Sequence, residues 1–271
     1  MVELLEDRVI MNIHGLDAEK FLQGQTTNDI IKNRYSYNFI LNNQGRYLFD
    51  FFVFRESNKS FYIDIHKNSA EAFLKRRSMY KLRSQVELKD ISEDFFVLYS
   101  KEIIDNALFS LQDPRNNKLG YRSIIKGNKF NKDKNYSTNL YLKDKYDFAI
   151  IDGDIDLIYE KSIPIEYGAD NLNAIDYQKG CYIGQEVISR AKYQGVVRKK
   201  IYKLNFDTEV APIDKGAMVT DLNGNKLGIV CSRYEKVAIV QLREEKYLGL
   251  EKKIAIIDHQ PASIQVPVWV R

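Results

Sequence analysis

Apolar runs of strand length dominate the first hundred residues and set the predicted fold. They occur at residues 8–13, 35–41, 47–54, 61–65, 86–88 and 95–99. The polar stretch from Asn42 to Gly45 joins two of these runs and predicts a hairpin with a four-residue loop. From Asn68 onward apolar residues recur at helical spacing, which predicts a helix over residues 69–80. This order predicts a mixed α+β unit with its helices on one face of an antiparallel sheet.

Capping and turn residues predict the shorter elements. Asp17 is expected to cap a helix over residues 18–23, because its carboxylate can accept free amide hydrogens. Residues 126–145 are rich in Lys, Asn and Asp and predict an exposed connection. From Val197 onward, short apolar runs separated by turns predict a small all-β barrel or sandwich. Within it, Asn223-Gly224 predicts a two-residue hairpin turn with positive φ.

Length and charge indicate a soluble protein of several compact units. A chain of 271 residues with 44% hydrophobic residues is long enough for two or three such units. The formal net charge is only +4, and the sequence has no apolar run of about 18 residues that would span a membrane. Acidic residues at Glu3, Glu6 and Asp7 differ from the pattern of a secretory signal. We therefore expect a cytoplasmic protein without a membrane partner.

Cysteine and histidine usage argues against a resident metal centre. The two cysteines, Cys181 and Cys231, cannot form a disulfide framework and suit a reducing compartment. His14, His66 and His259 are scattered, and the sequence contains neither CxxC nor HExxH. GxGxxG and GxxxxGK motifs are also missing, which argues against Rossmann dinucleotide binding and against a P-loop.

The segment 179–186, KGCYIGQE, concentrates the residues that could carry chemistry. Gly180 and Gly184 allow tight backbone conformations or the close approach of a ligand. A helix starting at Gln185 would direct its positive end toward Cys181, and with Lys179 nearby it would favour the thiolate. The alternative is a small packed cysteine at a turn. Cys231 lies in a predicted strand, where a buried structural role is expected.

The run 179–190, KGCYIGQEVISR, resembles the signature of the YgfZ-type family, which is related to the glycine-cleavage aminomethyltransferase, or T-protein. Supporting segments follow in the family's order at residues 15–30, 42–54, 113–122, 163–176 and 196–200. The resemblance implies an α+β fold in which three domains form a ring, with mixed α+β units and a small C-terminal β-barrel. Residues 1–41 and 132–196 would form the folate-binding domain, 42–131 an α+β (ferredoxin-like) domain, and 197–271 the barrel.

The resemblance also implies a function and site residues. Family members bind tetrahydrofolate and support the assembly or repair of iron–sulfur clusters in client enzymes, including enzymes that modify tRNA. The implied catalytic residues are Cys181, Lys179 and Asp50. The implied folate-binding residues are Glu166, Arg198, Arg46, Asn28, Tyr121 and Gln185. Glu166 lies in a P-x-E element, and its carboxylate could pair with the amino-pyrimidine edge of a pterin. Arg198 and Arg46 could bind the glutamate tail. Cys181 would contact a cluster only in passing, because one thiol cannot hold a stable cluster.

One departure from the T-protein pattern bears on the reaction. T-proteins carry two adjacent acidic residues in the second strand of the hairpin, whereas this chain has Phe49 and Asp50. Loss of a positioned carboxylate can cost a factor of about 100 to 10,000 in rate. We therefore expect no aminomethyltransferase activity. The alternative is an active aminomethyltransferase with Asp50 as its acid and a lipoyl-carrier protein as its partner.

A second alternative is an RNA-binding module. It would use the basic residues Lys67, Lys75, Arg76, Arg77, Lys81, Arg83, Lys192, Arg198, Lys199 and Lys200. Such a site would lose affinity steeply as salt is raised. Because the overall charge is modest, a solvated basic surface is the simpler interpretation. The expected partners are therefore folate and iron–sulfur client or assembly proteins, without direct binding of nucleic acid.

Overall fold

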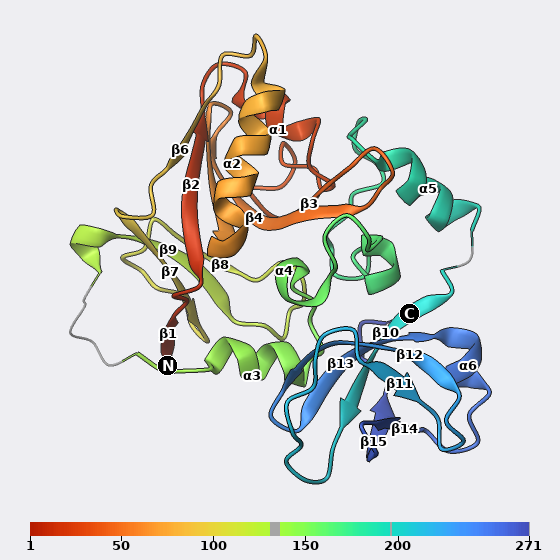
Figure 1. Ribbon diagram of the computed structural model, residues 1–271. Coiled ribbons are helices and arrows are strands. Elements are labelled where there is room, and N and C mark those ends of the chain that lie inside the picture. Colours follow the sequence, from red (N-terminus) through yellow and green to blue (C-terminus); the bar gives the residue numbers. More distant parts are fainter. Residues whose placement is uncertain (131–135, 196, 271) are drawn as a thin grey trace.

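The computed structural model describes residues 1–130, 136–195 and 197–270, and combines two antiparallel sheets with a closed barrel (Figure 1). The larger sheet has the strand order β3-β4-β5-β2-β6. Its strands are β2 (Arg8–His14), β3 (Tyr35–Leu41), β4 (Tyr47–Ser57), β5 (Ser60–His66) and β6 (Glu87–Asp90). All neighbouring strands in it are antiparallel. The predicted hairpin, and the strands before and after it, are thus confirmed.

Two helices, α1 (Ala18–Gln23) and α2 (Lys67–Lys81), cover one face of this sheet (Figure 1). Phe73 of α2 packs edge-on against Phe49 and Phe51 of β4, with ring centroids 5.6 and 5.3 Å apart. Both helices were predicted, but the capping role of Asp17 was wrong. Its carboxylate accepts a 2.8 Å hydrogen bond from the backbone amide of Gln85, and no side-chain cap forms on α1. A distant backbone group therefore competes successfully for this carboxylate.

The smaller sheet has the order β1-β7-β9-β8, again antiparallel. It consists of β1 (Val2–Leu4), β7 (Phe95–Ser100), β8 (Phe109–Gln112) and β9 (Tyr121–Lys126). After the short 3-10 helix η1 (Gly127–Lys129) comes α3 (Leu140–Asp147), where we had predicted exposed connection. That prediction was wrong for α3, because Leu140, Tyr141 and Tyr146 are buried in the core. Residues 131–135 of the predicted connection lie outside the described residues.

The C-terminal unit is a closed barrel with the order β10-β13-β12-β11-β14-β15. Its elements are β10 (Lys199–Asn205), β11 (Met218–Thr220), β12 (Lys226–Tyr234), β13 (Val237–Arg243), α6 (Glu244–Leu248), β14 (Ile254–Ile257) and β15 (Gln260–Gln265). The predicted hairpin around Asn223-Gly224 exists, but its turn is longer than two residues, and Gly224 has a positive φ of 83°. Asp221 organises this turn by accepting from the amides of Asn223 and Asn225.

Short helical segments occupy the space between the sheets and the barrel (Figure 1). They are α4 (Gly153–Asp156), η2 (Pro164–Tyr167) and α5 (Gln185–Tyr193). The predicted boundary between residues 41 and 42 falls in the turn between the paired strands β3 and β4. Among the described residues, no helix has both the length and the apolar character needed to cross a membrane.

Candidate functional site

The KGCYIGQE loop is held against the β3–β4 hairpin by two closely opposed glycines. Gly184 ends the loop with a φ of 82°, and Gly45 in the hairpin turn has a φ of 69°. A Cβ on Gly184 would lie 2.6 Å from the carbonyl oxygen of Asn42, and one on Gly45 would lie 2.8 Å from the Cβ of Val187. Both positions therefore require glycine for backbone conformation and for space.

Cys181 is exposed at the surface of this loop. The adjacent Gly180 has open space where a side chain would project. Gln185 and Tyr182 form two hydrogen bonds across the turn that follows Cys181. The backbone amide of Tyr182 donates to Gln185 Oε1 at 3.3 Å, and the backbone amide of Gln185 donates to the Tyr182 carbonyl. The predicted helix at Gln185 is confirmed as α5, and the thiol in front of it can be reached from solvent.

Lys179 anchors the loop from inside. Its ammonium donates to the carbonyl oxygens of Gln23, Thr26 and Asn28 at 2.8, 2.6 and 2.8 Å. The residue is only 7% exposed, and burial lowers its pKa to about 8, against the opposing fields of Asp29 and Asp176. Lys179 thus ties the loop to residues 23–28 through hydrogen bonds to their backbone. Sequence reasoning could not identify these acceptors, because they are backbone groups about 150 positions away.

Cys231 is buried at 1% exposure in β12, as predicted. Burial raises the pKa of its thiol, and the field of Asp156 adds to this. Of the two thiols, only Cys181 is therefore accessible.

Asp50 lies at the centre of the molecule, 3% exposed. Its carboxylate accepts hydrogen bonds from the Tyr37 hydroxyl at 2.8 Å, the Tyr47 hydroxyl at 2.9 Å and the Asp154 amide at 2.9 Å. Burial raises the pKa of Asp50, although Arg8 opposes the shift. The carboxylate is thus held by three donors from three different segments.

Charged and aromatic side chains fill the space around Asp50. Arg115 pairs with both Asp113 and Asp152 at 2.6 Å, while Asp64 joins Arg8 and Arg122. A small cavity of about 10 Å³ lies beside this cluster and is lined by residues that include Arg8, Arg122 and Asp152. A single water needs about 10 to 15 Å³. Arg115 and Arg122 lie in the segment 113–122 that supports the family resemblance, but most of their acidic partners come from distant segments.

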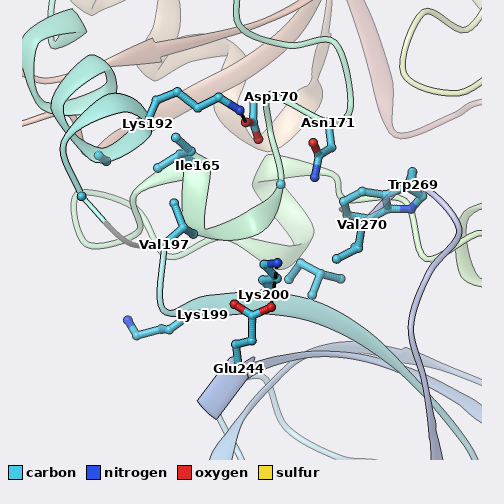
Figure 2. A pocket seen from close by; sticks show the side chains of 14 residues that line it. Ile165, Asp170, Asn171, Lys192, Val197, Lys199, Lys200, Glu244, Trp269 and Val270 are labelled. Atoms are coloured by element: carbon cyan, nitrogen blue, oxygen red, sulfur yellow. Dashed lines mark hydrogen bonds and ion pairs between the residues drawn. The ribbon is translucent and has the colours of Figure 1, made fainter. Parts of the chain in front are cut away.

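A larger pocket of about 480 Å³ lies between the central segments and the barrel (Figure 2). Its lining includes Ile165, Val197, Ile201, Trp269, Val270, Asp170, Lys192, Lys199, Lys200 and Glu244. Figure 2 shows Lys192 and Asp170 pointing toward each other at one end, with Trp269 and Val270 on the side away from Val197. Lys200 pairs with Glu244 at 2.7 Å. An apolar floor with charged groups at its rim can hold an aromatic ligand that carries acidic groups.

Glu166 lies in η2, next to this pocket. Its carboxylate forms an ion pair with the Lys199 ammonium at 3.0 Å, and the Glu166 side chain is 25% exposed. Its backbone carbonyl accepts from Gln241 of the barrel. Trp269, which sequence reasoning missed, packs its ring against Gly168 and donates from Nε1 to the Phe148 carbonyl at 2.8 Å. No sequence signal could have found this contact between residues about 100 positions apart.

The other predicted folate residues lie elsewhere. Arg46 donates to the Lys161 carbonyl at 2.7 Å, and Tyr121 is a half-buried strand residue in β9. Asn28 donates to the carbonyls of Tyr37 and Asn173. Arg198 is exposed, and its carbonyl accepts from the Glu244 amide. The structure thus distributes the six residues over several sites, with Glu166 and Arg198 nearest the 480 Å³ pocket.

Among residues 1–130, 136–195 and 197–270, no group of three or more His, Cys, Asp or Glu side chains could hold a metal ion.

Comparison with known proteins identifies relatives of this chain. No protein-family model matches it. It is 31% identical over 215 residues to a mitochondrial "Iron-sulfur cluster assembly factor IBA57 homolog" of Pyricularia oryzae, covering 73% of this chain and 55% of that protein. The Dictyostelium discoideum homologue is 30% identical, with coverages of 73% and 60%. The mouse protein is 26% identical over 98% of this chain and 84% of its own length. The chain thus spans little more than half the length of the first two relatives.

The comparisons bear on two expectations from the sequence, the location of the protein in the cell and its fold class. All three are named as mitochondrial proteins, so the expectation of a cytoplasmic protein was wrong. Among solved structures, the glycine cleavage system aminomethyltransferase T from Bartonella henselae matches with a TM-score of 0.74 at 14% identity. That match covers 99% of this chain and 86% of the transferase, and it confirms the predicted fold class. The chain is thus a homologue of the IBA57 iron–sulfur cluster assembly factors, which are relatives of the YgfZ type, and it has the fold of a glycine-cleavage T-protein.

Proposed function

We propose that this protein serves the assembly of iron–sulfur clusters in client proteins, with Cys181 as the thiol that contacts the cluster during transfer. The observation that carries the proposal is an exposed thiol on a loop fixed by Lys179 and Gly184. Thiolates are the usual ligands of these clusters, and a cluster is generally held by four of them. A partner protein must therefore supply the remaining ligands. Enzymes that modify tRNA are among the clients we expect.

The test is genetic rescue. A strain lacking the gene is restored with the wild-type chain, with Cys181→Ala, or with Gln194→Ala as a control at an exposed position at the end of α5. Activities of enzymes that need four-iron clusters are then measured. We expect wild type and Gln194→Ala to restore these activities and Cys181→Ala to fail, with all three proteins equally abundant. Full rescue by Cys181→Ala would remove the thiol from the mechanism.

Folate is the second part of the proposal, and the pocket beside Glu166 is the place that best suits it. Its volume of about 480 Å³ and the ring of Trp269 suit a pterin. Lys192 and Lys200 could exchange their carboxylate partners for the glutamate tail. A bound reduced folate would supply a one-carbon unit. The burial of Asp50 and its hydrogen bonds from two tyrosine hydroxyls argue against its use as the acid of an aminomethyl transfer.

Trp269 is the chain's one tryptophan, so its emission reports directly on this pocket. We expect tetrahydrofolate to quench that emission with saturation. Glu166→Gln should weaken binding by about tenfold, because it loses a charged acceptor. The exposed Glu245→Gln serves as control. Unchanged emission and no calorimetric heat up to about 1 mM folate, a concentration at which even weak ligands of this size bind, would exclude the folate part while leaving the thiol part standing.

A further inference from the structure

A second cavity, of about 520 Å³, opens beside the Cys181 loop. It lies between the start of β3 and the segment 173–178, and Tyr193 at the end of α5 also borders it. Gln178 belongs to its lining and precedes Cys181 by three residues. Three residues span at most about 11 Å. A group that enters this cavity is therefore close to the thiol.

Three amide side chains in the lining are engaged within the protein. Asn28 donates both of its Nδ2 hydrogens, to the carbonyls of Tyr37 and Asn173. Asn173 donates to the Pro114 carbonyl at 2.9 Å, and Asn33 donates to Asn28 Oδ1 at 3.4 Å. These hydrogen bonds hold the polar wall of the cavity in place.

Two tyrosine hydroxyls in the lining are unpaired within the part of the chain that the structure describes. The Oη atoms of Tyr35 and Tyr177 are buried, and neither has a hydrogen-bond partner there. Burial raises the pKa of both phenols, so both remain neutral. A neutral phenol can accept a hydrogen bond as well as donate one, and a ligand with N–H donors can therefore pair with it.

The charge of the lining is negative. Asp176 is its acidic residue, and one of its oxygens accepts from the Gln178 amide at 2.7 Å. The described lining contains no lysine or arginine. Two nearby cations are already engaged, because Lys179 binds backbone carbonyls and Lys192 pairs with Asp170 while lying 5.6 Å from the centroid of the Tyr177 ring. The aromatic ring of Tyr177 thus already lies beside a cation.

We propose that this cavity receives the guanidinium group of an arginine side chain from the protein partner that meets Cys181. A guanidinium is planar, carries five N–H donors and stacks on aromatic rings, which matches a lining with the Asp176 carboxylate, three tyrosines and, among the described residues, no cation of its own. Lysine offers only three donors from a point charge and fits less well. The proposal rests on the proposed role of Cys181 in cluster transfer and adds the chemistry by which the partner is recognised.

Titration of the full chain with N-acetyl-arginine methylamide, followed by NMR, tests the cavity without any cluster. We expect saturable binding that the corresponding lysine compound does not reproduce. Tyr177→Phe and Asp176→Asn should each weaken binding by about tenfold, the effect of one lost hydrogen bond to a charged group. Tyr182→Phe is the matched control, because its hydroxyl is also buried without a partner but does not line the cavity. Thermal unfolding of each variant verifies that it is folded.

Several results would overturn the proposal. They are equal binding of the lysine compound, equal effects of Tyr177→Phe and Tyr182→Phe, or no saturation at ligand concentrations of tens of millimolar. The double variant Asp176→Asn/Tyr177→Phe should also lose most of its rescue in the deletion strain. Full rescue by it would mean that a free guanidinium compound, and not a partner's arginine, occupies the site. Failure of the cluster role would be seen separately, as full rescue by Cys181→Ala with arginine binding intact.

Discussion

Replacing Lys179 with methionine tests whether the buried ammonium fixes the loop that presents Cys181. The change keeps the length of the side chain but removes hydrogen bonds to the carbonyls of Gln23, Thr26 and Asn28. Three charge-assisted hydrogen bonds at about 2 kcal/mol each amount to about 6 kcal/mol. Burying the charge opposes this stabilisation by about 3 kcal/mol. That figure is the free energy that corresponds to lowering the pKa of Lys179 from 10.5 to about 8. The variant should therefore lose about 3 kcal/mol of unfolding free energy.

Thermal unfolding measures this loss. For a chain of this size we expect the unfolding temperature to fall by about 10 °C. Lys192→Met is the control, because its ion pair with Asp170 involves a lysine that is 42% exposed, and a surface pair contributes little. Alkylation of Cys181 should also change in rate for Lys179→Met and not for Lys192→Met. Equal unfolding temperatures for Lys179→Met and wild type would refute the anchoring role.

The Lys179 ammonium also makes the unfolding free energy depend on pH. The folded chain releases the Lys179 proton near pH 8, whereas the unfolded chain keeps it until the ordinary value of 10.5. Between these values the unfolded chain binds more protons, so the stability of wild type rises with pH in that window. Lys179→Met lacks this contribution. The difference between the two unfolding free energies should therefore increase from pH 8 to 10.5 in urea titrations, and parallel curves would contradict the assigned pKa.

Three further predictions follow from burial and close packing. One thiol per folded chain should react rapidly with an alkylating reagent, because Cys181 is exposed and Cys231 is 1% exposed; two fast thiols would contradict this. Gly153→Ala should destabilise the chain by about 3 kcal/mol or more, since its Cβ would lie 2.4 Å from Asp50 Oδ1. Gly180→Ala is the control for Gly153→Ala in urea titrations of both variants, and it should be nearly neutral because nothing lies within 4 Å of its Cβ. Gly168→Ala should displace Trp269, whose ring would lie 2.4 Å from the new Cβ, and shift its emission to the red; an unchanged spectrum would contradict this packing.

Local patterns in the sequence were sufficient for most of the secondary structure. The hairpin of β3 and β4, the helices α1, α2 and α5, and the strands of the barrel follow from apolar periodicity and turn residues over a few positions. The exposed Cys181 and the buried Cys231 agree with this kind of reasoning, because a glycine-flanked turn and an apolar strand have different average burial. α3 escaped it, since its polar sequence hides a buried face that only its neighbours create.

Contacts between distant segments decided the candidate site, and no local pattern encodes them. Lys179 was expected beside the thiol, but its ammonium binds carbonyls about 150 positions earlier. Asp50 was named as a catalytic residue from the hairpin sequence, and the fold adds its hydrogen bonds from Tyr37, Tyr47 and the Asp154 amide. The sequence by itself determined which residues could do chemistry. The tertiary structure decided which of them remain accessible, because burial and hydrogen bonding depend on segments that meet only when the whole chain has folded.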